Sequence, residues 1–304
     1  MSKKAFVFPG QGSQYVGMGQ DLYTHFPEAK IIFDQAHEIL GRDIAALCFQ
    51  GPEEDLKKTE NTQAGIFLTS VCLARFLAKK GYQPDFVAGH SLGEVTACYI
   101  AGAFDLVNAL KIIKARGEFM AASFASDRSA MAAVLGMDSS KLKEVLTPYE
   151  HYPVVIANYN SPSQIVISGE KEGVRVASEA LKEQGAKRVI PLPVSGAFHS
   201  PLMSSAASKF ARYLEDIPFE DSKIPIILNR TAQPETKAQK LKENLSLQIK
   251  SPVFWVDSLH YLKNKVDFFI ECGPGKVLTG LIKKTLSDTQ IYSVSTLEDA
   301  QKLD

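Results

Sequence analysis

The residues best suited to chemistry are Gly89-His90-Ser91-Leu92-Gly93, which match the pattern Gly-x-Ser-x-Gly. In this pattern the serine lies on a sharp turn between a strand and a helix, and the glycines avoid clashes that larger side chains would make. The apolar run 86–88 before it and the helical spacing of 93–101 after it supply that context. A helix N-cap would explain the serine equally simply, but the context favours a nucleophile, with the Leu92 N–H placed to stabilise an oxyanion.

A nucleophilic serine needs a base, and His199 is the leading candidate. It follows a loop rich in small residues, 194–198, near the expected junction of two domains. His90 adjoins Ser91, but on a sharp turn its side chain should point away from the hydroxyl. A structural or surface histidine remains an alternative for His199. No Asp or Glu between the serine and the histidine stands out as the acid of a triad, which counts against a standard hydrolase.

Arg116 gives the clearest indication of a substrate. Its helical segment places Ala109, Ile112, Ile113 and Met120 on one apolar stripe, and Arg116 falls in that stripe. A guanidinium that faces a core needs an anionic partner, and a substrate carboxylate could form a bidentate pair with it. The alternatives are an internal salt bridge or a side chain that reaches out to water.

The glycine-rich loop Gly10-Gln11-Gly12-Ser13-Gln14 does not match a phosphate site. It lacks the Gly-Lys-Ser/Thr end of a P-loop, and Tyr15 occupies the third glycine position of a dinucleotide fingerprint. A plain turn is one interpretation. The other is a ligand-binding loop at the carboxyl end of the first strand, where α/β proteins bind their ligands.

Strands and helices alternate around these motifs. Apolar strands at 4–8 and 86–88 alternate with helical patterns at 28–41, 60–80, 93–101 and 105–123, which favours a parallel sheet covered on both faces. From 127 to 193 the order becomes βαββαβ, the pattern of a ferredoxin-like unit. We therefore expect an α/β fold: an α/β-hydrolase-like large domain of residues 1–126 and 194–304, with an inserted ferredoxin-like small domain of residues 127–193.

Composition excludes several classes of protein. The 304 residues carry 34 Lys plus Arg and 34 Asp plus Glu, so there is no basic excess for nucleic acid. The four cysteines lie far apart and form no Cys-x-x-Cys pair, so we expect reduced thiols in a cytoplasmic protein. The scattered histidines indicate no metal site. Neither a signal peptide nor a membrane span is expected, because the apolar runs are short or interrupted.

The ordered motifs resemble those of the malonyl-CoA:acyl carrier protein transacylases, essentially from end to end. Each motif is common alone, whereas the set in this order is specific. The motifs are Phe8-Pro9-Gly10-Gln11-Gly12-Ser13-Gln14, Gly89-His90-Ser91-Leu92-Gly93-Glu94, Arg116-Gly117, Asn160-Ser161-Pro162-Ser163-Gln164, Gly196-Ala197-Phe198-His199-Ser200, Gln248 before Ser251-Pro252-Val253, and Glu271-Cys272-Gly273-Pro274-Gly275.

The resemblance implies a role for each matching residue. Ser91 would be the nucleophile and His199 its base, oriented by backbone carbonyls that include the carbonyl of Gln248. The backbone N–H groups of Gln11 and Leu92 would form the oxyanion hole, and Arg116 would hold the malonyl carboxylate. The remaining positions support the site: Gln63 and Asn160 lie near it, and the bulky Phe198 would limit room at the α-carbon of the acyl group.

The resemblance also implies a reaction and its partners. Malonyl-CoA would acylate Ser91, and the phosphopantetheine thiol of acyl carrier protein would then take the malonyl group for fatty-acid synthesis, in a ping-pong sequence. No cofactor, nucleic acid or membrane would be involved, and we expect a monomer. Two rival hypotheses are an acyl hydrolase, which would not need Arg116, and an inactive docking protein, which would need none of Ser91, His199 and Arg116.

Overall fold

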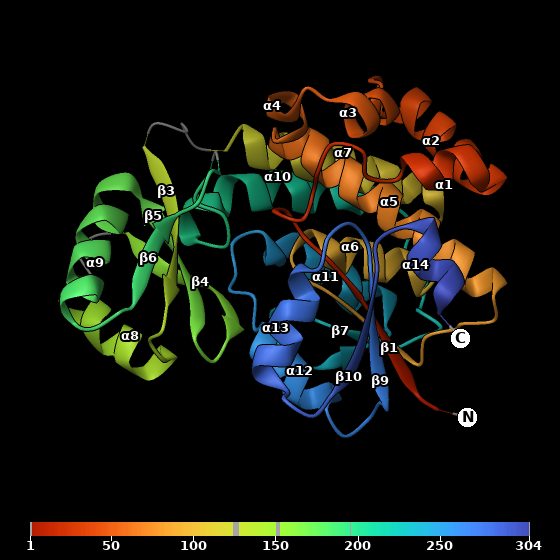
Figure 1. The fold of residues 1–304 in the computed structure, drawn as a ribbon. Helices are drawn as coiled ribbons and strands as arrows, with labels where there is room; N and C mark the ends of the chain where they lie inside the picture. The colour runs from red at the N-terminus through yellow and green to blue at the C-terminus, as the bar shows by residue number, and fades with distance from the viewer. Residues whose placement is uncertain (1, 124–127, 150–152, 195, 304) are drawn as a thin grey trace.

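The computed structural model describes residues 2–123, 128–149, 153–194 and 196–303, which form two sheets flanked by helices (Figure 1). The strands of the larger sheet are β1 (Lys4–Phe8), β2 (Phe86–Gly89), β7 (Ile226–Ile227), β8 (Pro234–Glu235), β9 (Phe268–Cys272) and β10 (Gln290–Val294). Those of the smaller sheet are β3 (Ser129–Leu135), β4 (Val154–Ser161), β5 (Gln164–Glu170) and β6 (Arg188–Pro191).

The helices before the smaller sheet are α1 (Gln20–His25), α2 (Pro27–Leu40), α3 (Ile44–Gln50), α4 (Glu53–Leu56), α5 (Thr59–Lys79), α6 (Leu92–Ile100) and α7 (Leu106–Ala121). The small domain contains α8 (Ser139–Leu146) and α9 (Lys171–Glu183). The helices that follow are α10 (Ser204–Glu215), α11 (Ala238–Gln248), α12 (Trp255–Leu262), α13 (Val277–Thr285) and α14 (Leu297–Lys302). A short 3₁₀ helix, Pro201–Met203, leads directly into α10.

The larger sheet has the strand order β10-β9-β1-β2-β7-β8. All its pairings are parallel except that of β7 with the short edge strand β8. In β1, Ala5 and Val7 pack against α12 and α13, whereas Phe6 and Phe8 belong to the core that contains α2, α5 and α6. Successive side chains of a strand point to opposite faces, so this alternation of apolar residues covers the sheet with helices on both sides.

The register of the parallel strands fixes where the site must lie. Phe8 at the end of β1 pairs with Gly89 at the end of β2. Because parallel strands end at the same edge of a sheet, the loop after β1 and the turn that carries Ser91 are neighbours. This edge of the large domain faces the smaller sheet.

The smaller sheet is antiparallel, with the strand order β4-β5-β3-β6. This topology is that of a ferredoxin-like unit, and it confirms the fold class expected from the sequence. One face of the sheet is covered by α8 and α9, whose apolar residues form a separate core with it. Of the expected boundaries of this domain, the first, between residues 126 and 127, lies outside the described residues.

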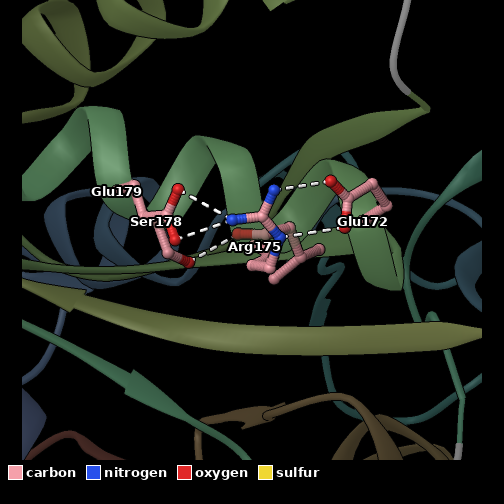
Figure 2. Close-up of polar contacts among 5 residues, drawn as sticks. Glu172, Arg175, Ser178 and Glu179 are labelled. Carbon is pink, nitrogen blue, oxygen red and sulfur yellow. Dashed lines mark hydrogen bonds and ion pairs between the residues drawn. The ribbon is translucent and has the colours of Figure 1, made fainter.

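The sequence of α9 explains why this segment forms a helix that packs on the smaller sheet. Val174, Ala177 and Leu181 recur at helical spacing and are buried against the sheet. On the opposite, exposed face, Arg175 forms ion pairs with Glu172 and Glu179 at distances of 2.6 and 2.7 Å (Figure 2). Exposed pairs of this kind stabilise a helix only slightly, so burial of the apolar face supplies most of its stability.

The two domains are joined by main-chain hydrogen bonds as well as by the connecting segments. The Tyr159 N–H in β4 donates to the Val253 carbonyl, and the Val253 N–H donates to the Ala157 carbonyl, each at 2.9 Å. The strand β4 therefore continues its pairing into the segment before α12, and this junction lies next to Ser251.

Candidate active site

Ser91 occupies a strained turn between β2 and α6. Its φ of 52° lies in the left-handed region that residues other than glycine rarely adopt. The turn depends on its two flanking glycines: a Cβ on Gly89 would lie 1.8 Å from the Gly93 carbonyl carbon, and a Cβ on Gly93 would lie 2.0 Å from the Phe8 carbonyl oxygen. The packing of the turn against β1 thus explains the Gly-x-Ser-x-Gly spacing.

His199 lies against the Ser91 hydroxyl. The distance from Ser91 Oγ to His199 Nε2 is 2.7 Å, and His199 Nδ1 lies 3.1 Å from the Gln248 carbonyl oxygen and 3.0 Å from the Ser251 carbonyl oxygen. A carbonyl oxygen can only accept, so Nδ1 carries the proton and Nε2 presents its lone pair to the hydroxyl. Two main-chain carbonyls therefore occupy the position beside Nδ1 that the carboxylate of a Ser-His-Asp triad would occupy. No sequence pattern had indicated that the Ser251 carbonyl would contact His199.

The environment of His199 keeps its ring neutral. Burial, followed by the nearby Arg116 and His90, lowers the pKa of His199 to about 3. The imidazole is consequently in its basic form at neutral pH. His90 itself does not contact the hydroxyl: its Nε2 donates to Asn160 Oδ1 at 2.8 Å.

Arg116 projects from α7 into the same site. Only 1% of the residue is exposed, so its side chain does not reach water. Its guanidinium donates to three oxygens, none of them a carboxylate: Gln63 Oε1 at 2.7 Å, Gln248 Oε1 at 2.9 Å and Ser91 Oγ at 3.2 Å. Within the described residues, Arg116 has no ion pair, so the internal salt bridge considered above is not observed.

The charge on Arg116 persists despite its burial. Burial lowers the pKa of Arg116 to about 10, while the negative charge of Glu94 opposes that change. The group is still a cation at neutral pH, and a buried cation without a counterion is costly. The arrangement thus leaves a place for an anionic group beside the Ser91 hydroxyl.

A pocket of about 130 Å³ brings the remaining candidates together. Ser91, His199 and Arg116 line it, as do Gln11, Gln63, Leu92, Asn160 and Phe198. Leu92 is the first residue of α6, so its N–H has no partner within the helix. Both domains contribute to the walls, with apolar side chains that include Met120 from α7 and Met131 and Val166 from the small domain.

The structure also bears on the expectations drawn from composition. Cys48, Cys72, Cys98 and Cys272 are buried free thiols. Within the described ranges, no group of three or more His, Cys, Asp or Glu residues could hold a metal ion. No helix of those ranges is long and apolar enough to cross a membrane.

An elbow serine paired with histidine, on an α/β-hydrolase-like sheet with an inserted ferredoxin-like domain, defines a class of enzymes that act on acyl groups. Within that class, this chain belongs to the acyl transferase domain family, whose model matches residues 5–302. The family resemblance of the ordered motifs is thereby confirmed, and the protein is an acyltransferase.

The relatives of this chain are similar to it along nearly its whole length. The malonyl CoA-acyl carrier protein transacylase of Bacillus subtilis is 46% identical over 301 residues, which cover 98% of this chain and 95% of that protein. The acyl carrier protein S-malonyltransferase of Vibrio cholerae has a TM-score of 0.96 at 38% identity, with 100% of both chains covered. A malonyl-transacylase in complex with its type II PKS acyl-carrier protein also has a TM-score of 0.96 at 38% identity, covering 99% of this chain and 98% of that one.

Proposed function

We propose that this acyltransferase moves the malonyl group from malonyl-CoA to the phosphopantetheine thiol of acyl carrier protein, through a malonyl ester on Ser91. The observation that carries the proposal is the buried guanidinium of Arg116, 3.2 Å from the Ser91 hydroxyl oxygen and without a carboxylate partner among the described residues. A malonyl group is an acyl group that ends in a carboxylate, so it fits this pair of residues. The names of relatives 46% and 38% identical over nearly the full chain agree with this substrate.

In the first half-reaction, His199 Nε2 takes the proton of Ser91 as Oγ attacks the thioester carbonyl carbon of malonyl-CoA. The oxyanion is held by the backbone N–H groups of Gln11 and Leu92, both of which line the pocket. When the tetrahedral intermediate collapses, the carbon–sulfur bond breaks. The proton passes from His199 to the sulfur of the departing coenzyme A.

In the second half-reaction, the phosphopantetheine thiol gives its proton to His199 and its sulfur attacks the ester carbonyl. The bond to Ser91 Oγ then breaks, and Oγ recovers the proton. The same imidazole would serve both half-reactions, because the Gln248 and Ser251 carbonyls lie within hydrogen-bond distance of its Nδ1.

The substrate carboxylate would also raise the pKa of His199. Arg116 is the second cause, after burial, of the low pKa of His199. A carboxylate paired with Arg116 offsets that positive charge and raises the pKa of His199 toward a value more useful for general-base catalysis. The base would thus be strongest when the correct acyl group is bound.

Selectivity follows from the same contacts. Gln63 and Gln248 hold the guanidinium of Arg116 in place. An acetyl group has no carboxylate and would leave this buried cation without an anion, so it would be rejected strongly. Phe198 lines the pocket and would limit room at the α-carbon. Because a single methyl group is discriminated by only about 1–3 kcal/mol, methylmalonyl would be rejected less strongly than acetyl.

The steps above use only groups of this chain and its two substrates, so we propose that no cofactor takes part. We further propose a cytoplasmic monomer that supplies fatty-acid synthesis, with residues 1–126 and 194–304 as its large domain and residues 127–193 as its small domain. Acyl carrier protein is the proposed acceptor, in keeping with the relative that was solved with its acyl-carrier protein.

The test is mass spectrometry of the purified protein after brief exposure to malonyl-CoA without an acceptor. We expect one malonyl adduct, located on the peptide that contains Ser91, and its loss when holo-acyl carrier protein is added. Free malonate without an adduct would show a hydrolase instead. Unchanged protein and unchanged malonyl-CoA would show a docking protein. The Ser91→Ala variant is the control and should form no adduct.

A further inference from the structure

Glu94 is a buried carboxyl group near the site to which the mechanism assigns no role. It lies in the first turn of α6, three residues after Ser91, and is 0% exposed. Burying a carboxyl group is costly unless hydrogen bonds compensate, so its partners indicate what it does. Within the described residues it forms no ion pair; Arg116 and Arg230 act on it only as more distant charges.

Both carboxyl oxygens of Glu94 accept short hydrogen bonds from asparagines. Oε2 accepts from the Asn229 backbone N–H, and Oε1 accepts from the side-chain amide of Asn244 in α11. Glu94 thereby ties α6 to the segment after β7 and to α11. The last residue of α11 is Gln248, which contacts both Arg116 and His199.

Asn229 connects Glu94 to the turn that bears the nucleophile. Its Oδ1 accepts the Ser91 backbone N–H at 2.7 Å, and its Nδ2 donates to the Gly89 carbonyl at 2.6 Å. The two bonds hold the Gly89 carbonyl and the Ser91 N–H, so they fix the backbone that leads into Ser91, the residue with positive φ. They therefore oppose relaxation of the strained backbone, whose persistence requires support from its surroundings.

We propose that Glu94 and Asn229 are positioning residues for acylation of Ser91: Glu94 fixes the Asn229 backbone, and the Asn229 side chain holds the nucleophile turn in its strained conformation. This inference rests on the proposed function. The Ser91 N–H already donates to Asn229 Oδ1, so it is not free to bind the oxyanion. The next N–H group along the turn, that of Leu92, would bind it instead.

The proposal assigns Glu94 its role through hydrogen bonds rather than through charge. Burial raises the pKa of Glu94 to about 7, so the neutral carboxyl group is readily accessible in the folded protein. Asn244 Oδ1 is buried and has no hydrogen-bond partner among the described residues. A glutamine at position 94 could keep the bond to the Asn229 N–H and donate to that oxygen once the Asn244 amide has turned over.

The first experiment compares single-turnover acylation by malonyl-CoA in the wild type and in Asn229→Ala. We expect the maximal acylation rate to fall about 10- to 100-fold, because misplacement of a reacting group by an ångström costs that much. The concentration of malonyl-CoA at half-maximal rate should change less than about threefold, since Asn229 is absent from the pocket lining. An Asn229→Ala rate within about twofold of the wild-type rate would overturn the proposal.

The second experiment separates hydrogen bonding from charge at Glu94. Glu94→Gln should acylate within about threefold of the wild-type rate, and Glu94→Ala should lose as much as Asn229→Ala. The double variant Glu94→Ala with Asn229→Ala should be no slower than Asn229→Ala alone, because one residue acts through the other. A Glu94→Gln variant as slow as Asn229→Ala would contradict the assignment, and it decides the question even if Glu94→Ala does not fold.

Glu271 provides a matched control. It is also a fully buried carboxyl group that accepts two backbone N–H groups, those of Leu278 and Thr279 at 2.9 and 2.7 Å. Glu271→Gln should lower the melting temperature without slowing acylation; if it slows acylation as much as Asn229→Ala, the effect is general loosening and the inference fails. Absence of any adduct in the wild type would instead reject the proposed function itself.

Discussion

The guanidinium of Arg116 donates to the hydroxyl oxygen of Ser91 across 3.2 Å, although 25 positions separate the two residues in the chain. The same hydroxyl lies 2.7 Å from the imidazole of His199. A neutral imidazole and a buried cation therefore both contact the oxygen atom of one serine hydroxyl. This relationship is the physical basis of the proposed preference for an acyl group that carries its own carboxylate.

The different surroundings of Gly93 and Gly280 predict opposite effects of their substitution by alanine. Gly93→Ala should destabilise the protein by more than about 3 kcal/mol, because the new Cβ would lie 2.0 Å from the Phe8 carbonyl oxygen. Gly280→Ala, in the middle of α13 with nothing within 4 Å of its Cβ, should stabilise it by about 0.5–1 kcal/mol. Urea unfolding of both variants checks this pair, and equal effects would contradict it.

The contact of His199 with main-chain carbonyls predicts that the side chain of Ser251 is dispensable for acylation. Ser251→Ala keeps the carbonyl that accepts from His199 Nδ1 at 3.0 Å, so its acylation rate should stay within about threefold of the wild-type rate. His199→Ala should lose at least about a thousandfold. Single-turnover acylation distinguishes the two; a Ser251→Ala rate as low as that of His199→Ala would show that the hydroxyl, not the carbonyl, matters.

The lowered pKa of His199 predicts how stability depends on pH. The folded-state pKa of about 3 lies below the unfolded value of about 6.5, so the unfolded chain binds the proton first as the pH falls. The contribution of this group to stability is therefore constant above about pH 6.5 and decreases as the pH falls toward 3.

A variant without the titrating ring isolates this contribution. From about pH 7 to about pH 5, the wild type should lose about 2 kcal/mol more of its unfolding free energy than His199→Gln loses. Urea unfolding at several pH values measures the difference between the two proteins. A difference that does not change over this range would mean that the histidine titrates normally in the folded state.

The sequence predicted the first two strands and the long helices of the large domain, because their apolar periodicity is regular, but it did not predict the short helices α1, α3 and α4. The strands expected at 4–8 and 86–88 appear as Lys4–Phe8 and Phe86–Gly89, and the helix expected at 60–80 as Thr59–Lys79. No helix was assigned at 238–248, where α11 lies. In α11 the polar residues Asn244, Ser246 and Gln248 are buried, so the pattern of polar and apolar residues does not mark the face that points inward.

Buried polar residues that no sequence pattern marks also limit what could be predicted of the site. Ser91 and His199 stand in local motifs, and Arg116 interrupts an apolar stripe, so each can be noticed in the chain. Asn229 has no such pattern, and Glu94 is indistinguishable in sequence from an exposed carboxylate at a helix start. Their positions depend on contacts between residues 135 and 150 positions apart, which one sequence does not reveal.

The proposed selection of the acyl carboxylate by Arg116 is tested most directly by the ratio of the Ser91 acylation rates with malonyl-CoA and acetyl-CoA. The wild type should favour malonyl-CoA by at least about a thousandfold, and Arg116→Ala should reduce that preference to less than about tenfold. An Arg116→Ala variant that still prefers malonyl-CoA as strongly as the wild type would show that Arg116 does not select the carboxylate.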